Sequence, residues 1–204
     1  TETILQLVAK SKKSTTVSRF IEALSQIEGA YALVALTNKK LIGVRDPLGI
    51  RPLIIGMLDG KYILASETCA LDIIDAKFVR EVENGEIVVI TEDGIESIKP
   101  FPKTKARPCV FEFIYFSRPD SIVNGMSVYD CRKSFGRQLA RESPTPADIV
   151  IPVPDSGVPA AIGFAEASKI PFELGIIRNH YVGRTFIEPQ QSIRALSVKL
   201  KHNA

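Results

Sequence analysis

The 204-residue sequence has little charge imbalance and no long charged or apolar run. Its formal net charge is +3 at pH 7, and runs of five or more like charges are missing, so a nucleic-acid-binding surface is not indicated. The apolar runs are only as long as a strand, which leaves no candidate for a membrane-spanning helix. The N-terminus lacks a charged segment followed by an apolar one, so no signal peptide is visible. These absences predict a protein that binds neither nucleic acid nor membrane.

Cysteine is also scarce. The three cysteines, Cys69, Cys109 and Cys131, are widely spaced and form no CxxC pair. This spacing fits neither a disulfide framework nor a zinc site. A reducing cytoplasm is therefore the expected location.

Hydrophobic residues make up 45% of the chain, enough for one sizeable core or two small ones. Two different patterns divide them. Residues 30–98 alternate short apolar runs with turn residues, as antiparallel hairpins do. Residues 147–177 instead follow the order strand, helix, strand. The proline-rich basic stretch 100–108 lies between the two patterns, so the sequence predicts an α+β fold followed by an α/β fold, joined by a linker or an exposed connection.

Apolar spacing predicts the individual elements. The aromatic stretch Phe111–Phe116 is predicted to be a strand, with Phe111, Phe113 and Phe116 in a core. A tail from residue 192 is expected to begin another helix or strand. The other predicted elements are helices at 1–9, 18–27, 69–74 and 128–141, and strands at 31–36, 41–45, 53–57, 62–66, 86–91 and 95–98.

The most informative stretch runs from Ala147 to Gln191. Its first apolar segment ends in Pro154-Asp155-Ser156-Gly157, and a helical pattern follows from Val158 to Ser168. Asp155 offers oxygen ligands of the kind that Mg²⁺ prefers. Ser156 and Gly157 open a helix whose free N–H groups and positive dipole end suit an anion. The same turn is also an ordinary helix cap, and taken alone it favours the cap.

A second loop changes this balance. The basic segment Arg178 to Thr185 follows the next apolar segment, and in a βαβ unit both loops lie at the carboxyl ends of strands. Its side chains are cationic or carry hydroxyl groups, and we expect them to converge on the same anion as the first loop: Arg178, His180, Tyr181, Arg184 and Thr185.

These two loops, VPDS at 153–156 and NHYVGRTFIEP at 179–189, resemble the phosphoribosyltransferase half of glutamine phosphoribosylpyrophosphate amidotransferases. Two more stretches resemble that family: FEFIYFSRPDS at 111–121, and the segment 46–69 with DPLGIRPLIIG and YILASETC. The resemblance covers essentially the whole chain. It implies the late part of an N-terminal-nucleophile (Ntn) glutaminase domain at 1–107 and the start of a type I phosphoribosyltransferase domain at 108–204.

The resemblance also implies a reaction. The family transfers glutamine-derived ammonia to phosphoribosylpyrophosphate and forms 5-phosphoribosylamine, pyrophosphate and glutamate, the first step of de novo purine (IMP) biosynthesis. Glutamine and phosphoribosylpyrophosphate are thus the implied substrates, and Mg²⁺ the implied cofactor. A cytoplasmic homo-oligomer, either dimer or tetramer, is the implied state.

Site residues follow from the same resemblance. Asp155, Ser156 and Gly157 match the pyrophosphate loop, with Ser156 at a position that contacts Mg²⁺. Residues 181–188 resemble the flexible loop that closes over the substrate, and this implies substrate contacts from Tyr181, Arg184 and Thr185. Cys109 stands where some members carry one ligand of a 4Fe–4S cluster. Cluster ligand and small core residue are equally open interpretations of Cys109.

The family's glutaminase nucleophile is a cysteine at the start of the mature chain, and no cysteine precedes Cys69 here. Thr1 is not expected to replace it, because Thr1 begins a helical pattern whereas such a nucleophile begins a buried strand. The paired acids of the family's ribose-phosphate motif are absent too. We therefore assign no catalytic residue. Two alternatives stay open: a truncated, catalytically dead product, and another phosphoribosyltransferase with an unrelated β domain.

Overall fold

A computed structural model describes all 204 residues, which form two compact units. Unit 1 holds Thr1–Glu112 and Phe116–Gly125, and unit 2 holds Phe113–Tyr115 and Met126–Ala204. The predicted division at 107/108 into glutaminase and phosphoribosyltransferase domains stays a prediction, because compactness alone does not assign a domain to a family.

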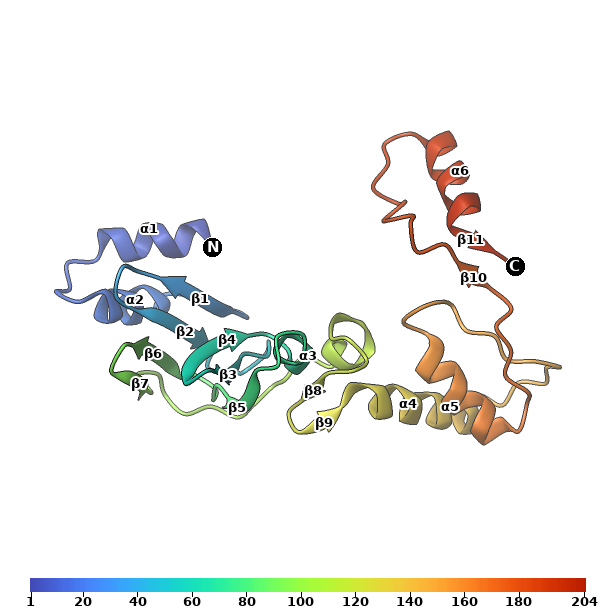
Figure 1. Cartoon of the computed structure of the whole chain (residues 1–204), viewed down its shortest axis with the longest axis horizontal. Helices are drawn as coiled ribbons and strands as arrows, with labels where there is room; N and C mark the ends of the chain where they lie inside the picture. Colours follow the sequence, from blue (N-terminus) through green and yellow to red (C-terminus); the bar gives the residue numbers. More distant parts are fainter. The chain divides into compact units, whose positions relative to one another are not determined.

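Unit 1 contains two antiparallel sheets, with strand orders β1-β2-β6-β7 and β4-β3-β5 (Figure 1). Most strands and helices predicted from sequence are confirmed within one or two residues. Its elements are α1 (Glu2–Lys10), α2 (Thr16–Leu24), β1 (Ala32–Leu36), β2 (Leu41–Arg45), β3 (Ile54–Leu58), β4 (Lys61–Ala65), α3 (Thr68–Asp72), β5 (Lys77–Glu81), β6 (Ile87–Thr91), β7 (Gly94–Ile98), β8 (Ile122–Val123) and part of the π-helix η1 (Glu112–Phe116).

The layering of unit 1 follows from alternation along its strands. On β2, Ile42 and Val44 face one side and pack with residues of α1 and α2. Gly43 faces the other side, where a Cβ would lie 2.7 Å from a methyl carbon of Leu64 on β4. Successive side chains of a strand point to opposite faces, so the first sheet is covered by helices on one face and by the second sheet on the other. The far face of the second sheet packs on α3 through Ile54.

Two features of unit 1 differ from the sequence prediction. Strand β5, KFVRE, was not predicted; it is a charged, largely exposed edge strand that pairs with β3. The predicted strand Phe111–Phe116 is wrong, because Glu112–Phe116 forms a π-helical turn closed by a bond from Ser117 N to the Glu112 carbonyl oxygen (3.1 Å). Phe113 is buried as expected, but Phe111 and Phe116 are about half exposed and contact each other instead.

The stretch 100–108 is an exposed connection rather than a free linker. Most of its side chains are exposed, yet its end is held by the backbone: Arg107 N donates to Leu48 O (2.8 Å) and Cys109 N to Ile50 O (3.0 Å). The segment is therefore fixed along the loop that follows β2.

Unit 2 is built on two helices that touch closely. Gly136 of α4 and Gly163 of α5 lie at the contact, where a Cβ on either would sit under 2 Å from a carbonyl oxygen of the other helix. Lys133 and Arg137 pair across it with Glu166 (2.5 and 3.2 Å). The elements are β9 (Met126–Ser127), α4 (Val128–Glu142), α5 (Val158–Ser168), β10 (Ile177–Arg178), α6 (Gln191–Lys201) and β11 (His202–Asn203).

The predicted order of strand, helix and strand is present, but the two strands are shorter than predicted. Helix α5 is confirmed, but the apolar segments on either side of it meet at a single parallel bridge, Val150 with Phe172. Bonds from Val150 N to Pro171 O (2.8 Å) and from Glu173 N to Val150 O (3.0 Å) hold that bridge. The tail forms α6 and then the short strand β11, which pairs with β10. None of the helices is both long and apolar enough to cross a bilayer.

Candidate functional site

The first predicted loop joins the Val150 segment to α5. Its peptide Pro154–Asp155 is cis, and the chain then turns into the helix through bonds from Gly157 N to Val153 O (3.1 Å) and from Val158 N to Asp155 O (3.3 Å). Gly157 is required by space, because a Cβ there would lie 2.7 Å from Val153 O. The side chains of Asp155 and Ser156 are consequently presented to solvent at the start of α5.

No side chain caps α5: Gly157 is the N-cap residue, and Pro159 stands in the first turn. The Asp-Ser-Gly turn thus begins a helix as an ordinary cap does, with Gly157 as the cap residue, but neither Asp155 nor Ser156 supplies a side-chain acceptor. The first N–H groups of α5 lack a side-chain acceptor, which is the arrangement that suits a bound anion.

One cation of the second loop contacts the first loop. Arg178 Nη1 is ion-paired with Asp155 Oδ2 although 23 residues separate them. Tyr181, Arg184 and His180 are exposed, and Thr185 is buried. The structure thus brings together Asp155 and Arg178, beside Ser156 and Gly157.

Small-molecule sites typically have volumes of about 300–1,000 Å³. A hollow of about 610 Å³ adjoins this loop. Ser156 and Gly157 form part of its wall, and α4 provides most of the remainder, including the buried Arg132. The wall is mainly apolar, through Ile114, Phe135 and Leu139. The hollow can therefore accept a group that carries both an apolar surface and an anion.

Metal ligands are sparse. The chain has no group of three or more His, Cys, Asp and Glu side chains that could hold a metal ion. Cys109 is half-buried and all three cysteines are free thiols. A 4Fe–4S cluster needs four thiolates, so this segment by itself does not fit one. Mg²⁺ is different, since it is held by one or two protein oxygens together with substrate phosphates, and Asp155 and Ser156 offer such oxygens.

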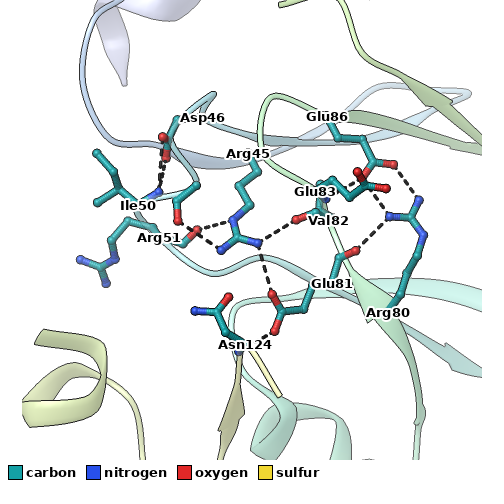
Figure 2. A network of polar contacts seen from close by, with 11 residues as sticks. Arg45, Asp46, Ile50, Arg51, Arg80, Glu81, Val82, Glu83, Glu86 and Asn124 are labelled. Atoms are coloured by element: carbon teal, nitrogen blue, oxygen red, sulfur yellow. Dashed lines mark hydrogen bonds and ion pairs between the residues drawn. The ribbon is translucent and has the colours of Figure 1, made fainter. Parts of the chain in front are cut away.

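Unit 1 contains a polar network that the sequence prediction missed (Figure 2). Arg45 is 4% exposed, and its guanidinium donates to Arg51 O (2.9 Å), Val82 O (2.8 Å) and Gly49 O (3.2 Å). Asp46 is fully buried and accepts from Leu48 N (2.9 Å) and Ile50 N (3.1 Å). Together they shape the loop 46–51. The sequence feature that could have predicted this network is the Arg-Asp pair at the end of an apolar strand.

A second part of the network centres on Glu86, which is also fully buried. It accepts from Arg80 through two nitrogens (2.8 and 2.7 Å), from Glu83 N (2.6 Å) and from Ser97 Oγ (2.6 Å). Burial by itself raises the pKa of Glu86, but these hydrogen bonds outweigh it and hold the pKa below its ordinary value. The pair therefore remains ionised in the folded protein.

Known proteins similar to this chain identify the class of domain that unit 1 forms. A glutamine amidotransferase domain family matches residues 1–72. With its two facing antiparallel sheets between helical layers, unit 1 is the later part of an Ntn-type glutamine amidotransferase domain. An unrelated β domain, one of the open alternatives, is thereby excluded.

Relatives at high identity cover the whole chain. It is 59% identical to the amidophosphoribosyltransferase of Rhizobium etli (100% of this chain, 42% of the relative) and 46% identical to that of Bacillus subtilis (100% and 43%). The solved structure of glutamine phosphoribosylpyrophosphate amidotransferase from B. subtilis, complexed with ADP and GMP, matches with a TM-score of 0.90 (46% identity, 100% of this chain, 45% of that one). Along its whole length the chain matches a segment of amidophosphoribosyltransferases, and it spans about 40% of the length of these relatives.

Proposed function

We propose that the protein containing this segment is an amidophosphoribosyltransferase that makes 5-phosphoribosylamine from phosphoribosylpyrophosphate and glutamine. Identity of 46–59% to proteins of that name over the whole of this chain carries the proposal. Water hydrolyses the glutamine amide to glutamate and ammonia. Ammonia then attacks C1 of the sugar, the bond from C1 to the pyrophosphate oxygen breaks, and the nitrogen loses a proton.

In this reaction we assign the segment mainly a binding role. The N–H groups at the start of α5, with Ser156, Gly157 and Asp155, receive the pyrophosphate group, and Arg178 restrains Asp155 until it binds. Tyr181, Arg184 and Thr185 belong to the loop that closes over the sugar. Catalysis of this kind depends on positioning and on stabilising the charge of the leaving group.

Mg²⁺ is the proposed cofactor. Ser156 and Asp155 would hold it together with the substrate's phosphates, and it would supply positive charge to the leaving pyrophosphate. A 4Fe–4S cluster with Cys109 as one ligand is proposed only together with three cysteines from outside this segment. We further propose that the protein is a homo-oligomer. We also propose that it is cytoplasmic, and the three free thiols support this location.

A chimera tests the proposal. In it, this chain replaces the matching segment of the R. etli relative, and formation of phosphoribosylamine is measured with ammonia and with glutamine. Ser156→Ala should lower kcat/KM for phosphoribosylpyrophosphate about tenfold or more, the loss of one hydrogen bond to a charged group. Ser143→Ala, at an exposed serine that ends α4, should not change it. A chimera that folds but forms no product with either nitrogen source contradicts the proposed function.

The loop 181–188 gives a second expectation. Arg184 is exposed, whereas Arg45 is buried, so trypsin should cleave after Arg184 early and spare Arg45. In the chimera, phosphoribosylpyrophosphate with Mg²⁺ should slow cleavage at Arg184, because closure of a loop over substrate orders its backbone. Mass spectrometry of timed digests measures both rates. Early resistance at Arg184, or cleavage that the substrate leaves unchanged, would show that this loop is not the lid.

A further inference from the structure

Two Asn-Gly sequences occur in the chain, at Asn84-Gly85 and at Asn124-Gly125. An asparagine before a glycine can lose its side-chain amide, because glycine has no side chain to hinder attack of its backbone nitrogen on the asparagine Cγ. Both sequences share this chemical feature, so the local sequence does not distinguish them. The structure does distinguish them, because one is exposed and the other lies in a loop that is held by buried hydrogen bonds.

Asn124 and Gly125 form the two-residue loop between the short strands β8 and β9. Both residues are exposed, and both have positive φ, 49° and 72°, as a two-residue hairpin loop requires. Each strand has only two residues, and a short two-stranded hairpin is marginally stable. The loop therefore leaves its turn conformation readily.

The backbone nitrogen of Gly125 is free to react. It donates to no acceptor in the chain, and the space around Gly125 is open, since a Cβ there would meet nothing within 4 Å. Asn124 is held by its backbone alone: Asn124 N donates to Glu81 Oε1 (2.6 Å), as Figure 2 shows. The attacking nitrogen and the amide that it attacks are therefore both unrestrained.

The other Asn-Gly sequence is protected at the same atoms. Gly85 is buried, and its backbone nitrogen donates to the Asp46 carbonyl oxygen (3.0 Å). The Asn84 side chain lies against Gly49, where a Cβ would come within 1.8 Å of Asn84 Oδ1. Attack at Asn84 requires that Gly85 first lose its hydrogen bond and that the loop open, and both changes cost free energy.

We infer that Asn124 is a site of spontaneous deamidation and that Asn84 is protected from it. The Gly125 nitrogen attacks Cγ of Asn124, and the bond from Cγ to Nδ2 breaks. The amide nitrogen leaves as ammonia with the proton that Gly125 gives up, and a five-membered succinimide ring remains. Water then opens the ring at either carbonyl carbon, which leaves an aspartate or an isoaspartate. This chemistry needs only water and does not depend on the proposed function.

Deamidation should also change the surroundings of position 124. It adds a negative charge next to the Glu81 carboxylate, which accepts from Asn124 N and pairs with Arg45 (3.3 Å). An isoaspartate in addition lengthens the main chain of the turn by one carbon, whereas the pairing of a hairpin depends on the length of its loop. We therefore expect the bond between position 124 and Glu81 to be lost in the product.

Timed incubation of the 204-residue chain under mildly alkaline conditions tests the inference by peptide mass spectrometry, because the two asparagines fall in different tryptic peptides. In the folded chain Asn124 should deamidate about tenfold faster than Asn84 or more, because only Asn84 requires local opening. In urea the two rates should become similar, since the unfolded chain protects neither glycine nitrogen. The rate at Asn124 should rise with pH, because the Gly125 nitrogen must give up its proton.

Asn124→Gln and Asn84→Gln are the matched variants, because glutamine keeps the amide but must close a six-membered ring, which forms more slowly. Release of ammonia from the folded chain should fall strongly in Asn124→Gln and stay nearly unchanged in Asn84→Gln. Equal rates at the two asparagines of the folded, unsubstituted chain, or faster loss at Asn84, would overturn the inference. So would an Asn124 amide that stays intact in the folded chain while the chain in urea loses it.

Discussion

Gly136→Ala should destabilise unit 2 by about 3 kcal/mol, although alanine is the better helix former. A Cβ at this position would lie 1.8 Å from the Ala160 carbonyl oxygen and 2.9 Å from Phe164 N, both backbone atoms of α5. No side-chain rotation relieves contacts with backbone, so α4 and α5 must separate. Helix propensity alone predicts the opposite sign, a gain of about 1 kcal/mol. The sign of the change therefore decides between the two effects.

The change in the free energy of unfolding caused by Gly136→Ala is measured by urea unfolding, followed by far-ultraviolet circular dichroism. Gly183→Ala is the control, because a Cβ there meets nothing within 4 Å and its backbone is not in the left-handed region. That variant should match the wild type or exceed it slightly, since alanine restricts the unfolded chain. An unfolding midpoint that rises in Gly136→Ala would mean that the helices do not meet at this glycine.

Glu86→Gln should have the second large effect, a loss of about 2–3 kcal/mol of unfolding free energy at neutral pH. Glutamine keeps the volume but removes the charge that four donors around Glu86 share. Arg80 would then lose its partner, and part of it is buried. Glu83→Gln is the control, because Glu83 is in the same turn but its pair with Lys99 is exposed. It should change stability by less than about 1 kcal/mol.

The effect of Glu86→Gln should also depend on pH. The folded pKa of Glu86 is lowered, so its contribution is fully present above the unfolded pKa of about 4.3 and is lost as pH falls through the folded pKa. The difference between wild type and Glu86→Gln should therefore be largest near pH 7 and shrink below pH of about 4. A difference that stays constant down to pH of about 2 would show that the charge of Glu86 does not stabilise the fold.

The sequence by itself determined the periodic parts of this protein. Alternating apolar residues predicted the hairpins of unit 1, and the β3–β4 turn fell at Asp59-Gly60, where both residues have positive φ as a two-residue hairpin requires. Helical spacing predicted α2, α4 and α5. Long motifs carried the family resemblance, which the comparisons confirmed. Local patterns suffice here because each element buries one face whatever its neighbours are.

Only the tertiary structure decided the features that depend on distant partners. Strand β5 has the composition of a surface segment and is a strand because β3 offers it a backbone edge. The aromatic stretch at Phe111 is a π-turn rather than a strand, because Glu112 finds Arg51 and Ser117 there. Arg178 reaches Asp155 while Arg184 does not, although both follow the same segment. Sequence patterns record burial along one element, but a charged side chain is placed by the partner that offsets its desolvation, and that partner lies elsewhere in the chain.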